Sequence, residues 1–118
     1  MLSIKRKSIL SLSIAIVLLS CGGLIAAGIE LCVGYEQITD LSSAVGLSNI
    51  PTGTNAPTYA IIKPETNGVR WRGDGTDPTA NVGHPLASGE SLTYNADLNT
   101  IKFIQTGAGA KLNVTYFK

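Results

Sequence analysis

The stretch Gly68-Val69-Arg70-Trp71-Arg72 alternates between apolar and charged side chains. Successive residues of a β-strand point to opposite faces of the sheet, so Val69 and Trp71 share one face and both arginines share the other. An apolar face opposed to a charged face is typical of an antiparallel sheet with one side on a core and one side in water. The stretch therefore predicts a half-buried strand over residues 68–72.

Other segments of the chain show the same short, β-rich pattern. They are residues 58–63, 91–94, 100–105 and 111–117. The first of these is expected to end at Pro64, because proline cannot donate to a hydrogen-bonded ladder. Short strands separated by glycine, proline, asparagine and aspartate predict an all-β fold, either a small antiparallel β-sandwich or a barrel. We expect at least five strands after residue 55, and no long helix between residues 58 and 118.

The apolar faces of these strands predict the core of the fold. We expect the following side chains to be largely buried: Ile61, Val69, Trp71, Leu92, Ile101, Phe103, Leu112 and Val114. His84 precedes Pro85 in a stretch rich in glycine and proline, and it is interpreted as an ordinary loop residue. It is the single histidine of the chain, so a second histidine is not available to complete a metal site.

Length and charge limit the classes of protein to be considered. The chain has 118 residues, with nine basic and eight acidic side chains, which suits one compact domain. A nucleic-acid surface normally shows a clustered basic excess, so this balance predicts no nucleic-acid partner. We divide the chain into an apolar, signal-like or anchor-like segment over residues 1–30 and a β module over residues 31–118.

The N-terminal segment allows several interpretations. Lys5-Arg6-Lys7 precede residues 8–29, which contain no charged side chain and are long enough to cross a bilayer as a single helix. The segment is thus either a membrane anchor or a secretory signal cleaved after small residues. Leu18-Leu19-Ser20-Cys21 also resembles a bacterial lipobox, which makes Cys21 a candidate for lipidation. A start codon assigned too early is the remaining alternative.

The β module shows no motif of catalytic chemistry. No nucleophile elbow, dinucleotide fingerprint or phosphate-binding loop is present in the sequence, so we expect no catalytic, cofactor-binding or metal-binding residues. Asp74 and Asp77 lie in a glycine-rich segment, where a role in forming the turn is favoured over calcium binding. Arg70 and Arg72 are expected to be solvated or paired with acids such as Asp74, although a surface for anions or carbohydrates beside Trp71 is an alternative.

One ordered string extends beyond generic strand patterns. It runs Val69-Arg70-Trp71-Arg72-Gly73-Asp74-Gly75-Thr76-Asp77-Pro78-Thr79, and Gly89-Glu90-Ser91-Leu92-Thr93-Tyr94 follows it. With these segments, residues 31–118 resemble a family of small structural proteins of tailed bacteriophages. The resemblance implies a non-catalytic β module of the virion, associated with capsid or tail. Its partners would be other virion proteins or copies of itself.

The sequence also allows two alternatives to the virion role. The first is a membrane-anchored or exported surface lipoprotein of a bacterium or prophage, with membrane contact through residues 8–29. The second is a carbohydrate-binding module that uses Trp71. For the virion role, the expected contact site is the loop over residues 73–79 with its flanking charges, namely Arg70, Arg72, Asp74 and Asp77.

Overall fold

The computed structural model describes residues 29–118. Residues 31–118 form one compact unit, the β module. The predicted helix over residues 8–29, except for its last residue, and the candidate lipidation site Cys21 lie outside the described residues. Within the described part, no helix is long and apolar enough to cross a membrane.

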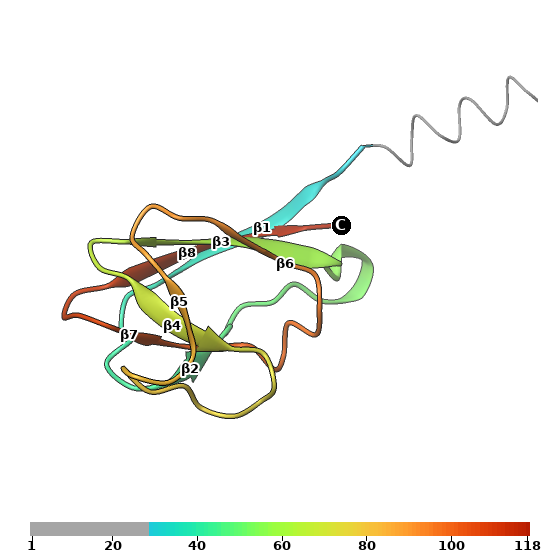
Figure 1. The fold of residues 1–118 in the computed structure, drawn as a ribbon. Coiled ribbons are helices and arrows are strands. Elements are labelled where there is room, and N and C mark those ends of the chain that lie inside the picture. The colour runs from blue at the N-terminus through green and yellow to red at the C-terminus, as the bar shows by residue number, and fades with distance from the viewer. Residues whose placement is uncertain (1–28) are drawn as a thin grey trace, which may run out of the picture. The chain divides into compact units, whose positions relative to one another are not determined.

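The β module consists of two antiparallel sheets of four strands each (Figure 1). The first sheet has the order β1-β8-β3-β6, formed by Cys32–Ile38, Lys111–Phe117, Tyr59–Glu65 and Leu92–Tyr94. The second has the order β2-β7-β4-β5, formed by Val45–Gly46, Lys102–Gln105, Val69–Arg72 and His84–Leu86. Among residues 29–118 the only helical element is the single turn η1 (Gly53–Asn55). The predicted all-β fold is therefore confirmed for the described residues.

The core lies between the two sheets and draws on both of them. From the first sheet come Ile38, Ala60, Ile62, Leu112, Val114 and Tyr116, and from the second come Val69, Leu86 and Phe103. Loop residues complete the cluster, namely Leu41, Leu98, Ile101 and Ala110. Because strands from distant parts of the chain share this core, it forms only when both sheets are assembled.

All five strands predicted by range are present, as β3, β4, β6, β7 and β8. Two boundaries differ from the prediction by two residues: β7 begins at Lys102, and β3 continues through Pro64 to Glu65. Strand β6 pairs only with Ala60, Ile61 and Ile62, so β3 has no strand partner on that side at Pro64. A proline is tolerated there because no ladder bond is required of its nitrogen.

The predicted core is correct except at three positions. Ile61 faces outward and Ile62 inward, because the face of Ile61 also holds Lys63 and Glu65, whose charges must stay in water. Val69, Ile101, Phe103, Leu112 and Val114 are buried as predicted. Trp71 and Leu92 are only partly buried, although both pack against the core cluster.

Three strands of the fold were not predicted. Strand β1 directly follows the apolar N-terminal run, and β2 is only two residues long. Strand β5 contains His84, which was interpreted as a loop residue; it instead pairs with Trp71 of β4. Pro85 in the same strand is compatible with β5 being the edge of its sheet.

Candidate contact surface

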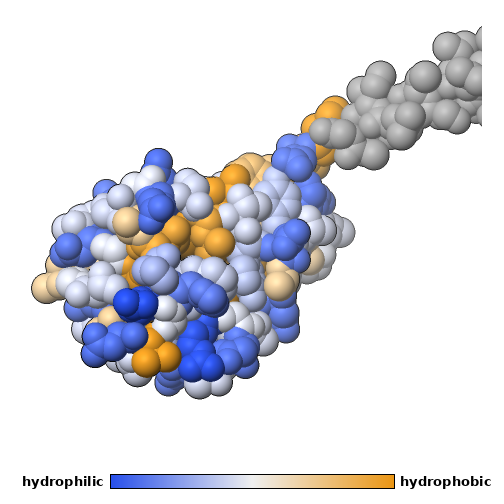
Figure 2. Space-filling view, viewed as in Figure 1, coloured by the Kyte–Doolittle hydropathy of each residue, from blue (hydrophilic) through white to orange (hydrophobic). Residues whose placement is uncertain are grey.

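The predicted contact residues lie on the outer face of β4 and in the loop that follows it. Val69 and Trp71 turn towards the core, so the alternation places Arg70 and Arg72 on the opposite, solvent-facing side. The loop over residues 73–83 then leads to β5, which pairs with β4. Figure 2 shows strongly hydrophilic side chains gathered on this lower part of the molecule, next to a small apolar area.

The first half of the loop is joined to β4 by an ion pair. Arg72 donates from Nε to Asp74 Oδ1 at 3.1 Å and from Nη2 to Asp74 Oδ2 at 2.5 Å. The hydrogen bond from Arg72, together with one from the Thr76 amide, holds the pKa of the Asp74 carboxyl below its usual range. Both side chains are substantially exposed, so this pair fixes geometry more than it adds stability.

A second ion pair ties the loop to the neighbouring strand. Lys102 of β7 donates to Asp77 Oδ1 at 2.8 Å. Arg72 and Lys102 are direct partners in the β4–β7 ladder, which places two cations side by side on one face. Each is paired with one aspartate of the loop, so their mutual repulsion is offset and the surface is locally neutral.

Arg70 holds the second half of the loop. Its guanidinium donates from Nε to the Ala80 carbonyl at 3.0 Å and from Nη1 to the Gly83 carbonyl at 2.7 Å. Thr79 and Val82 exchange backbone hydrogen bonds, which close a tight turn over residues 79–82. Gly83 adopts φ +137°, and a Cβ there would lie 3.1 Å from the Trp71 carbonyl, so this position requires glycine.

Three aromatic rings lie behind the loop. Trp71 and its ladder partner His84 have ring centroids 4.7 Å apart, and Tyr94 of β6 meets Trp71 edge-on at 5.8 Å. Because β4 and β6 belong to different sheets, this cluster bridges the two layers. Trp71 also packs against the core, which favours its interpretation as a structural residue over that of an exposed sugar-stacking platform.

A buried carboxylate, Glu36, was missed by the sequence analysis. It lies on β1, is only 6% exposed, and accepts hydrogen bonds from the Tyr116 hydroxyl, the Asn49 amide, and the amide and hydroxyl of Ser48. Burial raises the pKa of Glu36, but these hydrogen bonds outweigh burial and hold the pKa below its usual range. The network fastens the segment after β2 to the first sheet.

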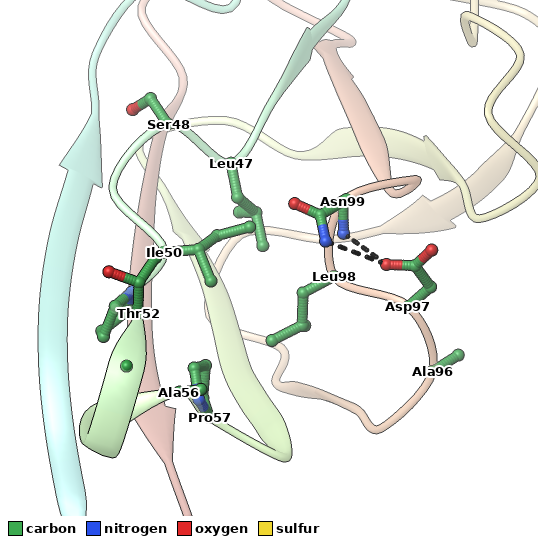
Figure 3. Close-up of a pocket in the computed structure, with 12 residues that line it drawn as sticks. Leu47, Ser48, Ile50, Thr52, Ala56, Pro57, Ala96, Asp97, Leu98 and Asn99 are labelled. Carbon is green, nitrogen blue, oxygen red and sulfur yellow. Dashed lines mark hydrogen bonds between the residues drawn. The ribbon is translucent and has the colours of Figure 1, made fainter.

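A hollow lies between residues 47–57 and 96–99 (Figure 3). Leu47, Ile50 and Leu98 point towards one another across it. The carboxylate at its rim, Asp97, accepts hydrogen bonds from the amide of Asn99 at 2.9 Å and from its side chain at 3.2 Å. The hollow thus has an apolar floor, and its acidic group stabilises its own turn.

The structure brings the four predicted contact residues together on one surface. Arg72 and Asp74 pair directly, Asp77 binds Lys102, and Arg70 binds the loop backbone. Lys102 was not singled out from the sequence, because its position opposite Arg72 depends on the pairing of β4 with β7. Among residues 29–118 there is no cluster of three or more histidine, cysteine, aspartate or glutamate side chains arranged to hold a metal ion.

Comparisons with known proteins do not indicate a function for this chain. No family model matches the sequence, and neither a curated protein nor a solved structure is significantly similar to it. The fold and the contact surface are therefore the observations on which a functional proposal rests.

Proposed function

We propose that this chain is a non-catalytic structural protein of a bacteriophage virion, whose β module acts through protein–protein contacts. The resemblance inferred from the ordered string over residues 69–79 motivates the proposal, and a β-sandwich offers a rigid surface that repeated copies can use. In a particle, many weak contacts of identical geometry add up to a stable assembly. The partners in this proposal are capsid proteins, tail proteins or copies of the chain itself.

The observation that supports the proposal best is the fixed geometry of residues 73–83. Arg70, Arg72 and Lys102 each bind this loop at a different point. A loop that is already ordered loses less conformational entropy when it binds a partner than a mobile one does. Its exposed, charge-balanced tip therefore suits the role of a contact site, with specificity from Asp74 and Asp77.

The alternative is a membrane-anchored or exported surface protein of a bacterium or prophage. In that case residues 8–29 contact the membrane, or Cys21 is acylated after removal of the preceding residues. The mass of the mature protein identifies the lipoprotein case, because cleavage removes a defined peptide and acylation of Cys21 adds a defined mass. An unprocessed chain without lipid on Cys21 excludes the lipoprotein, and its recovery in particles instead of membranes then favours the virion role over a retained anchor.

The test of the proposal is the protein content of purified particles from the corresponding phage. We expect the protein in a fixed number of copies per particle, measured by quantitative mass spectrometry. Asp77→Lys should reduce incorporation, because it places a cation beside Lys102 on the contact loop. Lys63→Glu, a change of charge of the same size and opposite sign on the outer face of the other sheet, serves as the control. Absence from particles, together with lipid on Cys21 in bacterial membranes, would overturn the proposal.

A further inference from the structure

The four edges of the two sheets differ in their capacity to accept another strand. Strand β2 has two residues, while β5 and β6 have three each and β5 contains Pro85. Strand β1 is the exception, with seven residues and neither proline nor lysine. Short strands, edge prolines, bulges and inward-pointing charges all hinder strand addition. Although β1 has a bulge between Cys32 and Gly34 and a buried Glu36, it is the longest edge strand in the described part and its ladder is regular from Gly34 to Ile38.

Within the described residues, one side of β1 has no backbone partner. Within residues 29–118, β1 pairs only with β8, and the backbone bonds between Leu31 and Lys118 extend that same pairing. The segment over residues 48–51 contacts β1 through side chains, with Glu36 accepting from Ser48 and Asn49. The outward amides and carbonyls of β1 thus remain available for a ladder.

Exposed apolar side chains concentrate at the same edge. The β module, residues 31–118, contains three large hydrophobic side chains that are strongly exposed, and two of them, Leu31 and Tyr35, lie in β1 or just before it. Tyr35 is 60% exposed although its hydroxyl donates to Asn113. A hydrophobic edge next to unpaired backbone groups is a typical site of strand pairing between chains.

We propose that β1 pairs antiparallel with β1 of a second copy of this chain, joining the two first sheets into one of eight strands. The proposal deepens the function proposed above, in which the module contacts copies of itself. A single open edge per copy favours a closed, twofold dimer, because a second open edge would be needed to continue a fibre. The partner is thereby specified as an identical strand.

The position of Glu36 selects the register of this pairing. A twofold axis through Glu36 would place two carboxylates opposite each other, and like charges in that position are unfavourable. An axis through Tyr35 instead places Glu36 opposite Gly34 and brings the two Tyr35 rings together on the outer face. In this register the bulge between Cys32 and Gly34 faces Gln37 and Ile38 of the second copy, so the regular part of the new ladder consists of residues 34–36 of each chain. We therefore infer the Tyr35-centred register.

Analytical ultracentrifugation of the full chain in detergent, over a range of concentrations, tests the dimer. A single seven-residue strand forms a small interface, so we expect dissociation in roughly the micromolar range. Tyr35→Lys should weaken the dimer about tenfold or more, because two ammonium groups then face each other. Thr93→Lys adds the same charge on edge strand β6 and should leave the dimer unchanged. Equal behaviour of both variants, or a monomeric wild-type chain throughout, would overturn the inference.

Disulfide trapping tests the register. Directly opposed residues of antiparallel strands have Cα atoms about 4.5–5.5 Å apart, within the range of a disulfide. Tyr35→Cys in a Cys21→Ser, Cys32→Ser background should give a covalent dimer on mild oxidation, and Thr93→Cys should not.

Particle assays separate this inference from the proposed function. If Tyr35→Lys is monomeric but enters particles normally, the β1 pairing is not the assembly contact, whereas a dimer that never enters particles contradicts the virion role alone.

Discussion

The hydroxyl of Tyr116 donates a hydrogen bond to the carboxylate of Glu36 inside the β-sandwich. The two residues lie on neighbouring strands, β8 and β1, and Tyr116 is the ladder partner of Gly34. A Cβ at Gly34 would lie 2.8 Å from Pro51 Cγ, so glycine at this position allows Pro51 to pack against the strand beside the tyrosine ring. Ser48 and Asn49 donate to the same carboxylate, so one buried charge joins both strands to the segment after β2.

Removing the Tyr116 hydroxyl should destabilise the module. Tyr116→Phe leaves the packing almost unchanged but deprives a buried carboxylate of one donor, which costs about 1.5–3 kcal/mol for a hydrogen bond to a charged group. The free energy of unfolding from urea titrations gives the measurement. Tyr35→Phe is the matched control, because the Tyr35 hydroxyl binds Asn113 on the exposed face, and its loss should cost less than about 1 kcal/mol. Equal losses for the two variants would contradict the role assigned to Glu36.

The same network predicts a loss of stability in acid. The pKa of Glu36 is lower in the folded protein than its ordinary value, so the folded state favours the ionised form. The stabilisation from ionised Glu36 is fully present above the pKa that this side chain has in the unfolded chain, about 4.3. It is lost as the pH falls through the lower pKa that Glu36 has in the folded protein. The exposed Asp40 and Asp74 also have lowered pKa values, so the difference between wild type and Glu36→Gln isolates Glu36. We expect this difference to shrink from pH 6 to pH 3, whereas a constant difference would contradict the prediction.

Local patterns in the sequence account for much of the fold. The alternation at residues 69–72 and 111–117 places each side chain on the face that the structure shows. The orientation of β3 was also encoded, because Lys63 and Glu65 lie on one face and Ala60, Ile62 and Pro64 on the other. Ending the predicted strand at residue 63 removed part of that evidence, and Ile61 was assigned to the core instead of Ile62.

Features that depend on distant partners could not be predicted in this way. A glutamate in a strand is ordinarily exposed, and the donors that make Glu36 tolerable in the interior come from residues 48, 49 and 116. The pairing of Arg72 with Asp74, two residues further on, was expected from local spacing. By contrast, the bonds from Lys102 to Asp77 and from Arg70 to the loop carbonyls require the final arrangement of β4, β5 and β7.

The two arginines of β4 should differ in their effect on the loop. Arg70→Ala removes both hydrogen bonds to the Ala80 and Gly83 carbonyls, so amide hydrogen exchange in residues 79–83 should accelerate about tenfold or more. Arg72→Ala removes only an exposed ion pair, and exchange in the same residues should change little. Exchange measured by mass spectrometry provides the comparison. Similar acceleration in both variants would show that Arg70 has no special role in holding the loop.

The β module should fold without the N-terminal segment. Every buried apolar side chain in the described part lies between Ile38 and Tyr116, so a chain beginning at Glu30 retains the whole described core. We expect this truncated protein to be soluble and to unfold cooperatively, as followed by circular dichroism. A truncated protein that does not fold would show that residues 1–29 contribute to the core. The full-length chain in detergent provides the reference melting temperature.

Replacement of Trp71 tests whether this residue is structural or serves in binding. Its ring packs on the core and contacts both His84 and Tyr94, so Trp71→Ala removes the link between the two sheets at this point. We expect a cost of about 3 kcal/mol, at the lower end for buried aromatic residues because Trp71 is only partly buried. Tyr59→Ala is the control, since Tyr59 stacks on Phe117 at the outer face and its loss should cost less. Thermal and urea unfolding of both variants give the comparison. If Trp71→Ala kept the wild-type stability, Trp71 would have to be reinterpreted as a surface residue for ligand binding, and screening against glycans would become the next experiment.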